Sequence, residues 1–200
     1  MDKFNVAIAD DNEKMLRLLG DIVAKDAELE VVGTAKDGVE AYELIKNKQP
    51  DVMLLDIVMP VMDGYEVLRA MSEDELLAHV PVLVTSEQDG DESELTALRL
   101  GASDFISKPY HCEILKHRLS HVIKMSEASK KIDALQRDEV TGLYTKVAFA
   151  EHAAQFLHEQ TDVEWNMIAL DIDRFKLVNE SYGQDSGDEL LAYLAKALLY

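Results

Sequence analysis

Short apolar runs alternate with amphipathic stretches along the first 124 residues. Runs of Val, Ile, Leu and Ala as short as these are typical of strands in a parallel sheet, which are buried on both faces. Between the runs, apolar residues recur at steps of three and four, as on one side of an α-helix. We expect strands at 4–9, 29–35, 52–55, 80–84 and 104–107, with helices that begin near residues 12, 37, 65, 92 and 113.

Strands that alternate with helices predict an α/β domain in which a parallel sheet lies between two helical layers. If the strands follow the flavodoxin-like order 2-1-3-4-5, the carboxyl ends of the first and third strands meet where the order reverses. Open parallel sheets bind their ligands at that point. The pattern therefore predicts a binding site at one end of a doubly wound sheet.

Polar side chains follow the strands at this predicted site. Asp10 and Asp11 follow the first strand, Asp56 the third, Thr85 the fourth and Lys108 the fifth. Three clustered carboxylates repel one another unless a cation lies among them, and oxygen ligands suit Mg²⁺. Beside such an ion, Asp56 could attack phosphorus and become an acyl phosphate, while Lys108 neutralises phosphoryl oxygens. The plainer alternative is that Asp56 only caps the next turn.

Residues 1 to about 124 resemble the receiver domain of two-component response regulators. The resemblance rests on the polar strand ends, the stretch MPVMDG after the third strand, an aromatic residue in the fifth strand and a Lys-Pro pair. These residues are Asp10, Asp11, Asp56, Met59–Gly64, Thr85, Phe105, Lys108 and Pro109.

The resemblance implies a role for each acidic residue. Asp56 is expected to accept a phosphoryl group from a histidine kinase. Mg²⁺ is expected to be bound by Asp10, Asp11, Asp56 and the backbone carbonyl of Val58. The predicted cofactor is therefore Mg²⁺, and the predicted partner is a sensor histidine kinase.

The resemblance also implies a switch pair. Thr85 is expected to follow the new phosphate, and the ring of Phe105 to turn inward behind it, while Lys108 contacts the phosphoryl oxygens. For Phe105, ordinary core packing remains an open alternative. The peptide bond between Lys108 and Pro109 is a candidate for the cis form.

The helix that begins near residue 113 does not end where a receiver normally ends. Its apolar residues continue at helical spacing, with no Gly or Pro before Gly142. Such a long helix with a narrow apolar stripe needs a surface to pack against. We expect a parallel coiled coil between two copies of the chain; a lone helix folded back on one domain is the alternative. The stripe comprises Leu115, Leu119, Val122, Met125, Ala128, Ile132 and Leu135.

Residues 138–200 carry a second set of polar residues. We expect a helix at 146–159, a strand at 165–170 that ends in Asp171, and a final helix from residue 189. An acid at a strand end, followed by a turn, suggests a metal or phosphate site. The amide of Asn179 and the carboxylate of Asp188 could together satisfy the edge of a guanine base. Turn and capping roles explain the same residues equally well.

This second part resembles the beginning of a GGDEF, or diguanylate cyclase, domain. The matching stretches are DEVTGLY at 138–144, DIDRFKLVNESYG at 171–183 and GDELL at 187–191. The resemblance implies an α+β domain that binds GTP and pairs with a second copy to make cyclic di-GMP. It assigns Mg²⁺ to Asp171 and the Ile172 carbonyl, the triphosphate to the backbone at Phe175 and Lys176, and guanine to Asn179 and Asp188.

Three departures from the GGDEF pattern bear on activity. The 200 residues do not include the GGDEF signature itself. Thr145 and Lys146 stand where the family usually has Asn-Arg, and Gln184 stands where it usually has His. We therefore expect this chain alone to be inactive as a cyclase.

Composition narrows the classes of partner. The 200 residues carry a formal net charge of -19, which disfavours nucleic acid because phosphate backbones are bound by Lys and Arg. The single cysteine fits a reducing compartment. No apolar run approaches the roughly 20 residues that span a bilayer, and the N-terminus does not read as a signal peptide. We expect a cytoplasmic protein that binds neither nucleic acid nor membrane.

These observations predict a receiver at 1–124, a helical linker at 125–137 and the first part of a truncated GGDEF-like domain at 138–200. The leading hypothesis is a homodimeric response regulator in which phosphorylation of Asp56 controls synthesis of cyclic di-GMP from GTP. One alternative is a non-enzymatic signalling module with a degenerate output domain. Another is a hybrid protein in which a later domain hydrolyses cyclic di-GMP.

Overall fold

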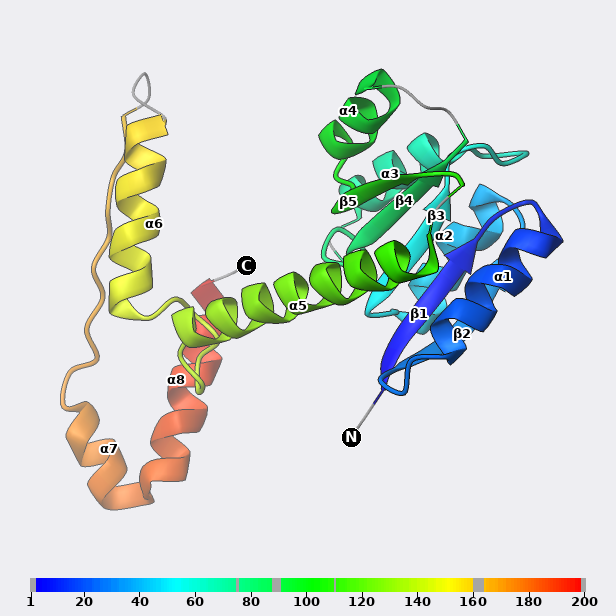
Figure 1. The fold of residues 1–200 in the computed structure, drawn as a ribbon. Helices are drawn as coiled ribbons and strands as arrows, with labels where there is room; N and C mark the ends of the chain where they lie inside the picture. Colours follow the sequence, from blue (N-terminus) through cyan, green and yellow to red (C-terminus); the bar gives the residue numbers. More distant parts are fainter. Residues whose placement is uncertain (1–2, 75, 88–90, 110, 160–163, 199–200) are drawn as a thin grey trace. The chain divides into compact units, whose positions relative to one another are not determined.

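The computed structural model describes residues 3–74, 76–87, 91–109, 111–159 and 164–198. The chain divides into two compact units, Met1–Glu127 and Ala128–Tyr200. The first unit contains a five-stranded parallel sheet with helices on both faces (Figure 1). The predicted doubly wound α/β class is therefore confirmed.

The strands lie in the order β2-β1-β3-β4-β5, and each is parallel to its neighbours. This is the flavodoxin-like order considered above. The chain passes from β1 to one side of the sheet and then, at β3, to the other, so the carboxyl ends of β1 and β3 flank the switch point. The strands are β1 (Phe4–Ala9), β2 (Leu29–Ala35), β3 (Val52–Asp56), β4 (Val82–Ser86) and β5 (Asp104–Ser107).

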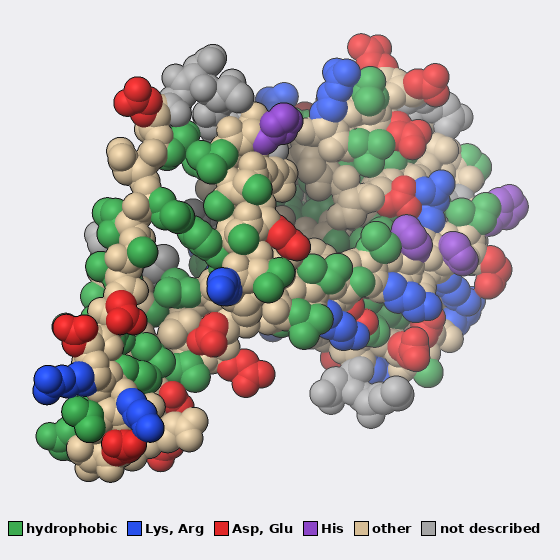
Figure 2. Space-filling view, turned by 90° about the vertical axis from the view of Figure 1, so that its left-hand side faces the viewer, with side chains coloured by type: hydrophobic (Ala, Val, Ile, Leu, Met, Phe, Trp, Pro, Cys, Tyr) green, Lys and Arg blue, Asp and Glu red, His purple; other side chains and the backbone are tan. Residues whose placement is uncertain are grey.

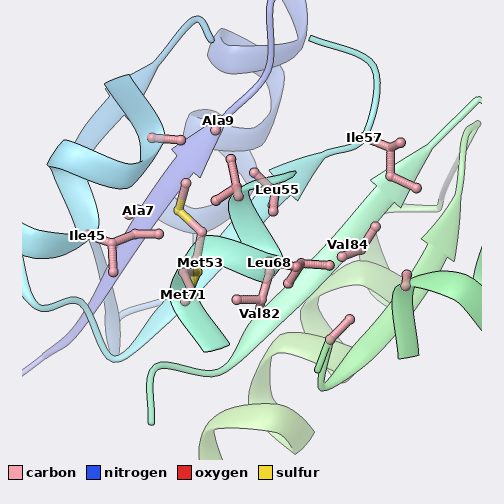
Figure 3. Packing of buried hydrophobic residues seen from close by; sticks show 14 of the residues in the cluster. Ala7, Ala9, Ile45, Met53, Leu55, Ile57, Leu68, Met71, Val82 and Val84 are labelled. Atoms are coloured by element: carbon pink, nitrogen blue, oxygen red, sulfur yellow. The ribbon is translucent and has the colours of Figure 1, made fainter. Parts of the chain in front are cut away.

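The helices that cover this sheet are α1 (Glu13–Ala24), α2 (Gly38–Lys48), α3 (Gly64–Glu73), α4 (Asp91–Arg99) and α5 (Cys112–Gln136). Successive side chains of a strand point to opposite faces. Accordingly, Met53 belongs to the apolar cluster that includes α2, α3 and α4, whereas Leu54 belongs to the cluster that includes α1 and α5. Figure 3 shows the first cluster, in which Ile45, Leu68 and Met71 pack over the strands.

Two element boundaries differ from the prediction for local reasons. Helix α3 ends at Glu73 rather than near residue 78, because Asp74 leaves the helical conformation and its carboxylate accepts a hydrogen bond from the Leu76 amide at 3.0 Å. Strand β4 begins at Val82 rather than Val80. Pro81 has no N–H to donate, and its carbonyl accepts a hydrogen bond from Met53 N at 2.9 Å.

Helix α5 is the long helix that the sequence predicted. Its first half is anchored in the first unit by buried apolar residues, namely Leu115, Leu119, Val122 and Ile123. Its second half exposes the remaining large residues of the predicted stripe, since 59% of Met125, 58% of Ile132 and 81% of Leu135 are accessible. The apolar stripe thus changes from a core contact to an open surface within one helix.

The described part of the second unit beyond α5 is helical and contains α6 (Lys146–Glu159), α7 (Phe175–Tyr182) and α8 (Gln184–Leu198). The predicted strand at 165–170 is wrong: residues 164–172 belong to no helix or strand. A strand needs a hydrogen-bonded neighbour, and the described residues of this unit provide no strand beside it. The apolar side chains of this segment are accordingly exposed, and Figure 2 shows such side chains on the surface.

None of the helices in the described ranges has both the length and the apolar character that crossing a membrane requires.

Candidate functional site

Three carboxylates meet at the carboxyl ends of two neighbouring strands. Asp10 and Asp11 follow β1, and Asp56 ends β3, which pairs directly with β1. One oxygen from each carboxylate lies within 4.8 Å of the others. Asp10 and Asp56 are buried, while Asp11 is exposed. The sheet therefore brings together the acidic residues that the sequence singled out, in a group able to hold a metal ion.

Lys108 reaches into the same group from the end of β5. Its Nζ donates a hydrogen bond to Asp10 Oδ2 at 2.8 Å and lies 3.1 Å from Asp56 Oδ1. The Lys108 amide donates to the Ser86 carbonyl at 2.7 Å, which ties this residue to β4. The peptide bond to Pro109 is cis. A buried ammonium thus offsets part of the negative charge at this site.

Burial and charge set the protonation of the two central groups. Burial raises the pKa of Asp56 from 3.8 to about 6; Lys108 opposes this shift, and the charges of Asp10 and Asp11 add to it. For Lys108, burial alone would lower the pKa, but the hydrogen bond to Asp10 and the charge of Asp56 outweigh it, so the pKa is raised. Lys108 therefore stays charged, and Asp56 ionises near neutral pH.

Two buried oxygens at this site accept or donate no hydrogen bond within the described structure. They are Oδ1 of Asp56, which has only the Lys108 ammonium at 3.1 Å beside it among the described ion pairs, and Oγ1 of Thr85. The two residues are register partners on β3 and β4. Buried polar atoms are normally paired, and leaving one unpaired costs free energy. Such atoms fit a site that awaits a metal ion or an anionic group.

Phe105 is 5% exposed and belongs to the apolar cluster beneath α4. Its register partner on β4 is Val84, the residue before Thr85. This inward position satisfies ordinary core packing, and it is also the inward position that the switch interpretation requires.

The loop after β3 is held by close backbone contacts. A Cβ on Gly64 would lie 2.5 Å from the Asp56 carbonyl oxygen, so only glycine fits there. Gly38 N donates to the Met62 carbonyl at 3.1 Å, and a side chain at Gly38 would collide with that carbonyl. The sequence gives no sign of this Gly38 contact, because the contact joins segments far apart in the chain. Val58 is about half exposed at the start of this loop.

The predicted nucleotide residues of the second unit lie on and before two packed helices. Asp171 and Ile172 precede α7, Phe175 and Lys176 form its first turn, Asn179 lies further along it, and Asp188 lies on α8.

Asn179 and the start of α8 are in close contact. Gly187 is buried, and a side chain there would collide with Asn179 Oδ1. That oxygen is itself buried and accepts no hydrogen bond within the described structure. The fold therefore brings Asn179 beside the residue before Asp188. Within the described ranges, Asp171 takes no part in a group of three metal-binding side chains.

Comparison with known proteins identifies the first unit. A family model for the response regulator receiver domain matches residues 6–120. The chain belongs to the response regulator receiver family. A model for the diguanylate cyclase, GGDEF domain, matches residues 135–199, so a GGDEF domain follows the receiver. Both resemblances inferred from the sequence are thereby confirmed.

Curated relatives are similar to part of this chain. A protein-glutamate methylesterase/protein-glutamine glutaminase 1 of Syntrophomonas wolfei is 45% identical over 111 residues, covering 54% of this chain and 31% of the relative. A protein of the same description from Pyrococcus horikoshii is 38% identical over 135 residues, covering 64% and 35%. The chain thus spans about a third of the length of these relatives.

Solved receiver structures share the fold of the first unit. The response regulator domain of Thermotoga maritima CheB is 31% identical with a TM-score of 0.56, covering 61% of this chain and 97% of that one. The receiver domain of the putative response regulator NarL from Mycobacterium tuberculosis is 36% identical with a TM-score of 0.57, covering 61% and 98%. These similarities show that the first unit has the receiver fold.

Proposed function

We propose that this chain is a phosphorelay response regulator whose Asp56 accepts a phosphoryl group from a histidine kinase in the cytoplasm. The observation that carries the proposal is the buried Asp56 carboxylate, whose Oδ1 lies 3.1 Å from a buried ammonium and which is grouped with two further carboxylates. A charged acceptor, a cation for phosphoryl oxygens and a set of oxygen ligands are the groups that phosphoryl transfer requires.

Mg²⁺ fits the donor set of Asp10, Asp11, Asp56 and the Val58 carbonyl, since hard oxygen ligands suit this ion. When bound, it supplies positive charge that neutralises both the carboxylates and the incoming phosphoryl oxygens. Lys108, already charged and buried beside Asp56, would contact the same phosphoryl group.

In the transfer step, a carboxylate oxygen of Asp56 forms a bond to phosphorus. The bond between phosphorus and the donor's imidazole nitrogen breaks, and its electron pair stays on that nitrogen, which then takes up a proton. The pKa of about 6 leaves Asp56 mostly ionised above pH 7, as attack requires. The unpaired hydroxyl of Thr85 is available to donate a hydrogen bond to the new phosphate, and Phe105 completes the proposed switch.

The proposed output is a GGDEF domain that makes cyclic di-GMP from GTP when the protein is complete. We assign the receiver to 1–124, the helical linker to 125–137 and the output to residues from 138 onward. In the output domain, Asp171 and the Ile172 carbonyl would hold Mg²⁺. The backbone at Phe175 and Lys176 would face the triphosphate, and Asn179 and Asp188 would recognise guanine.

The exposed stripe on the second half of α5 supports a homodimer, which cyclic di-GMP synthesis from two GTP molecules requires. A second candidate function is a non-enzymatic output that binds or regulates. The residues that favour it are Thr145, Lys146 and Gln184, which depart from the family pattern.

The phosphoacceptor assignment can be tested by labelling with acetyl phosphate. Asp56→Asn should abolish the acyl phosphate because an amide is not a nucleophile of this kind, and intact-protein mass spectrometry measures the result. Asp63→Asn is the matched control: this aspartate caps α3 in the adjacent loop, Asn also caps helices, and labelling should persist. Labelling of the Asp56 variant at the wild-type stoichiometry would refute the assignment.

A further inference from the structure

Two histidines lie one turn apart on the exposed side of α5. His117 and His121 are four residues apart, both are exposed, and both line one hollow in the surface beside β5. Residues four apart on a helix share a face, with their side chains one above the other. A pair of imidazoles with this spacing can bind one metal ion, as the i, i+4 histidines of zinc-binding helices do.

The backbone that carries this pair is held in place. Helix α5 is anchored to the sheet through the opposite face of the same turns, where four apolar side chains are buried: Leu115, Leu119, Val122 and Ile123. The two imidazoles therefore project from a helix that is already formed, so binding a metal ion would need to order only the side chains.

Two carboxylates also line the hollow, and they differ in the strength of their ion pairs. Asp104 is engaged by Arg118 at 2.6 Å, which neutralises both groups. Glu113 lies one turn before His117, and among the described residues its ion-pair partner is Lys116 at 3.2 Å. The Glu113 side chain is 86% exposed, so this pair is weak and Glu113 is free to rotate. Glu113 is therefore the carboxylate available to a metal ion held by the histidines.

We propose that His117 and His121 bind a divalent transition-metal ion of the zinc class, at a site separate from the carboxylates around Asp56. Within the described ranges, only Asp10, Asp11 and Asp56 already bring three ligand atoms within 4.8 Å of one another. The α5 site accordingly supplies two imidazole ligands, and water or a rotated Glu113 completes the coordination. Imidazole suits Zn²⁺, Cu²⁺ and Ni²⁺, whereas a carboxylate cluster suits Mg²⁺, so the two sites separate metals by ligand type.

The test is titration calorimetry of Zn²⁺ into the full 200-residue chain in saturating Mg²⁺, which keeps the carboxylate site filled. A Cys112→Ser background removes the one thiolate. We expect one Zn²⁺ per chain, and we expect His117→Ala and His121→Ala each to weaken binding at least about tenfold, since loss of even an outer partner of a metal-binding histidine costs this much.

The matched control is His79→Ala, which removes an exposed histidine from the connection between α3 and β4 and should leave Zn²⁺ affinity unchanged. All three histidines are exposed, so none of these variants should unfold the chain, and circular dichroism checks this. The proposal is overturned if no Zn²⁺ binds under these conditions, if either α5 variant binds as tightly as its parent, or if His79→Ala causes an equal loss.

Discussion

Asp56 combines two properties that oppose stability. Its side chain is 4% exposed in the structure, and one of its oxygens accepts no hydrogen bond within the described residues. Among the described residues, the Lys108 ammonium, 3.1 Å away, is the one ion-pair partner that compensates for its charge. A buried carboxylate in such surroundings is costly when ionised, and functional sites often retain groups of this kind at the expense of stability.

This cost predicts a pH-dependent effect of Asp56→Asn in Mg²⁺-free buffer. The folded chain raises the pKa of Asp56 from 3.8 to about 6, so protonated Asp56 favours the folded state. The corresponding contribution is present below pH 3.8 and is lost as the pH rises to about 6. Asn does not titrate, so the variant should become more stable than wild type across this window. Above this pH window, the difference in free energy of unfolding between the variant and wild type should level off at roughly 1–3 kcal/mol.

Urea unfolding of both proteins at several pH values measures this difference, and the titration of carboxylates remote from Asp56 cancels between them. Asp63→Asn, which alters an aspartate outside the buried group, should show no comparable gain. An Asp56→Asn variant less stable than wild type at neutral pH would contradict the argument.

At the scale of elements, the loop between β3 and α3 contains a strained turn. Met62 N donates to the Pro60 carbonyl at 2.8 Å, and Val61 between them has φ 68°. This is a γ-turn of the rare form with positive φ, which is unfavourable for a β-branched residue. Val61 is 83% exposed, so packing gives it little compensation. The loop therefore adopts this turn despite the preference of its central residue.

Val61→Gly should relieve this strain. A left-handed conformation costs an L-residue about 1–2 kcal/mol, and glycine avoids this cost. Glycine also loses more conformational freedom on folding, which offsets about 0.5–1 kcal/mol of the benefit, so we expect a net gain in stability of about 0.5–1 kcal/mol. Val58→Gly is the matched control in the same loop, where φ is not positive, and it should instead lose stability. Urea midpoints measure both changes; equal losses at the two positions would show that Val61 is not strained.

The elements differ in how well they could be predicted from the sequence. The five strands of the receiver could be predicted because parallel strands buried on both faces leave continuous apolar runs. The end of α3 at Asp74 could not, since it depends on the Asp74 side chain accepting a hydrogen bond from the backbone two residues later. Residues 165–170 also read as a strand, but pairing depends on a neighbour elsewhere in the chain, which apolar pattern does not supply.

The candidate site shows the same division. The convergence of the polar residues at the strand ends could be predicted from the sequence, because the carboxyl ends of parallel strands lie at one edge of the sheet. The double engagement of Lys108 by Asp10 and Asp56, and the unpaired oxygens of Asp56 and Thr85, depend on side-chain positions that spacing does not fix. The γ-turn at Val61 also gave no signal, because valine is not a turn-forming residue.

At the scale of the whole molecule, the exposed apolar residues of α5 and a net charge of -19 act in opposite directions. Burying Met125, Ile132 and Leu135 between two copies would favour association, while like charge on both copies opposes it. A change at the receiver could therefore shift a monomer–dimer balance by a modest free energy. This balance is where phosphorylation would act under the proposed function.

A phosphoryl mimic should raise the dimer fraction. With beryllofluoride and Mg²⁺, sedimentation velocity should show more dimer than without, and Ile132→Lys should abolish the increase by placing a charge in the stripe. Ala134→Lys adds the same charge at an exposed position off the stripe and should leave the increase intact. A monomer fraction that beryllofluoride does not change would remove the stalk from the mechanism.

The salt bridges of Lys108 have a consequence for ion selection. Because that ammonium pairs with two of the three acids, the pocket's formal balance is two negative charges rather than three. A divalent ion would bring this balance to neutrality, whereas Na⁺ or K⁺ would leave one negative charge without compensation. Under the proposed function, the lysine would therefore favour a divalent ion at this pocket before any phosphorus arrives.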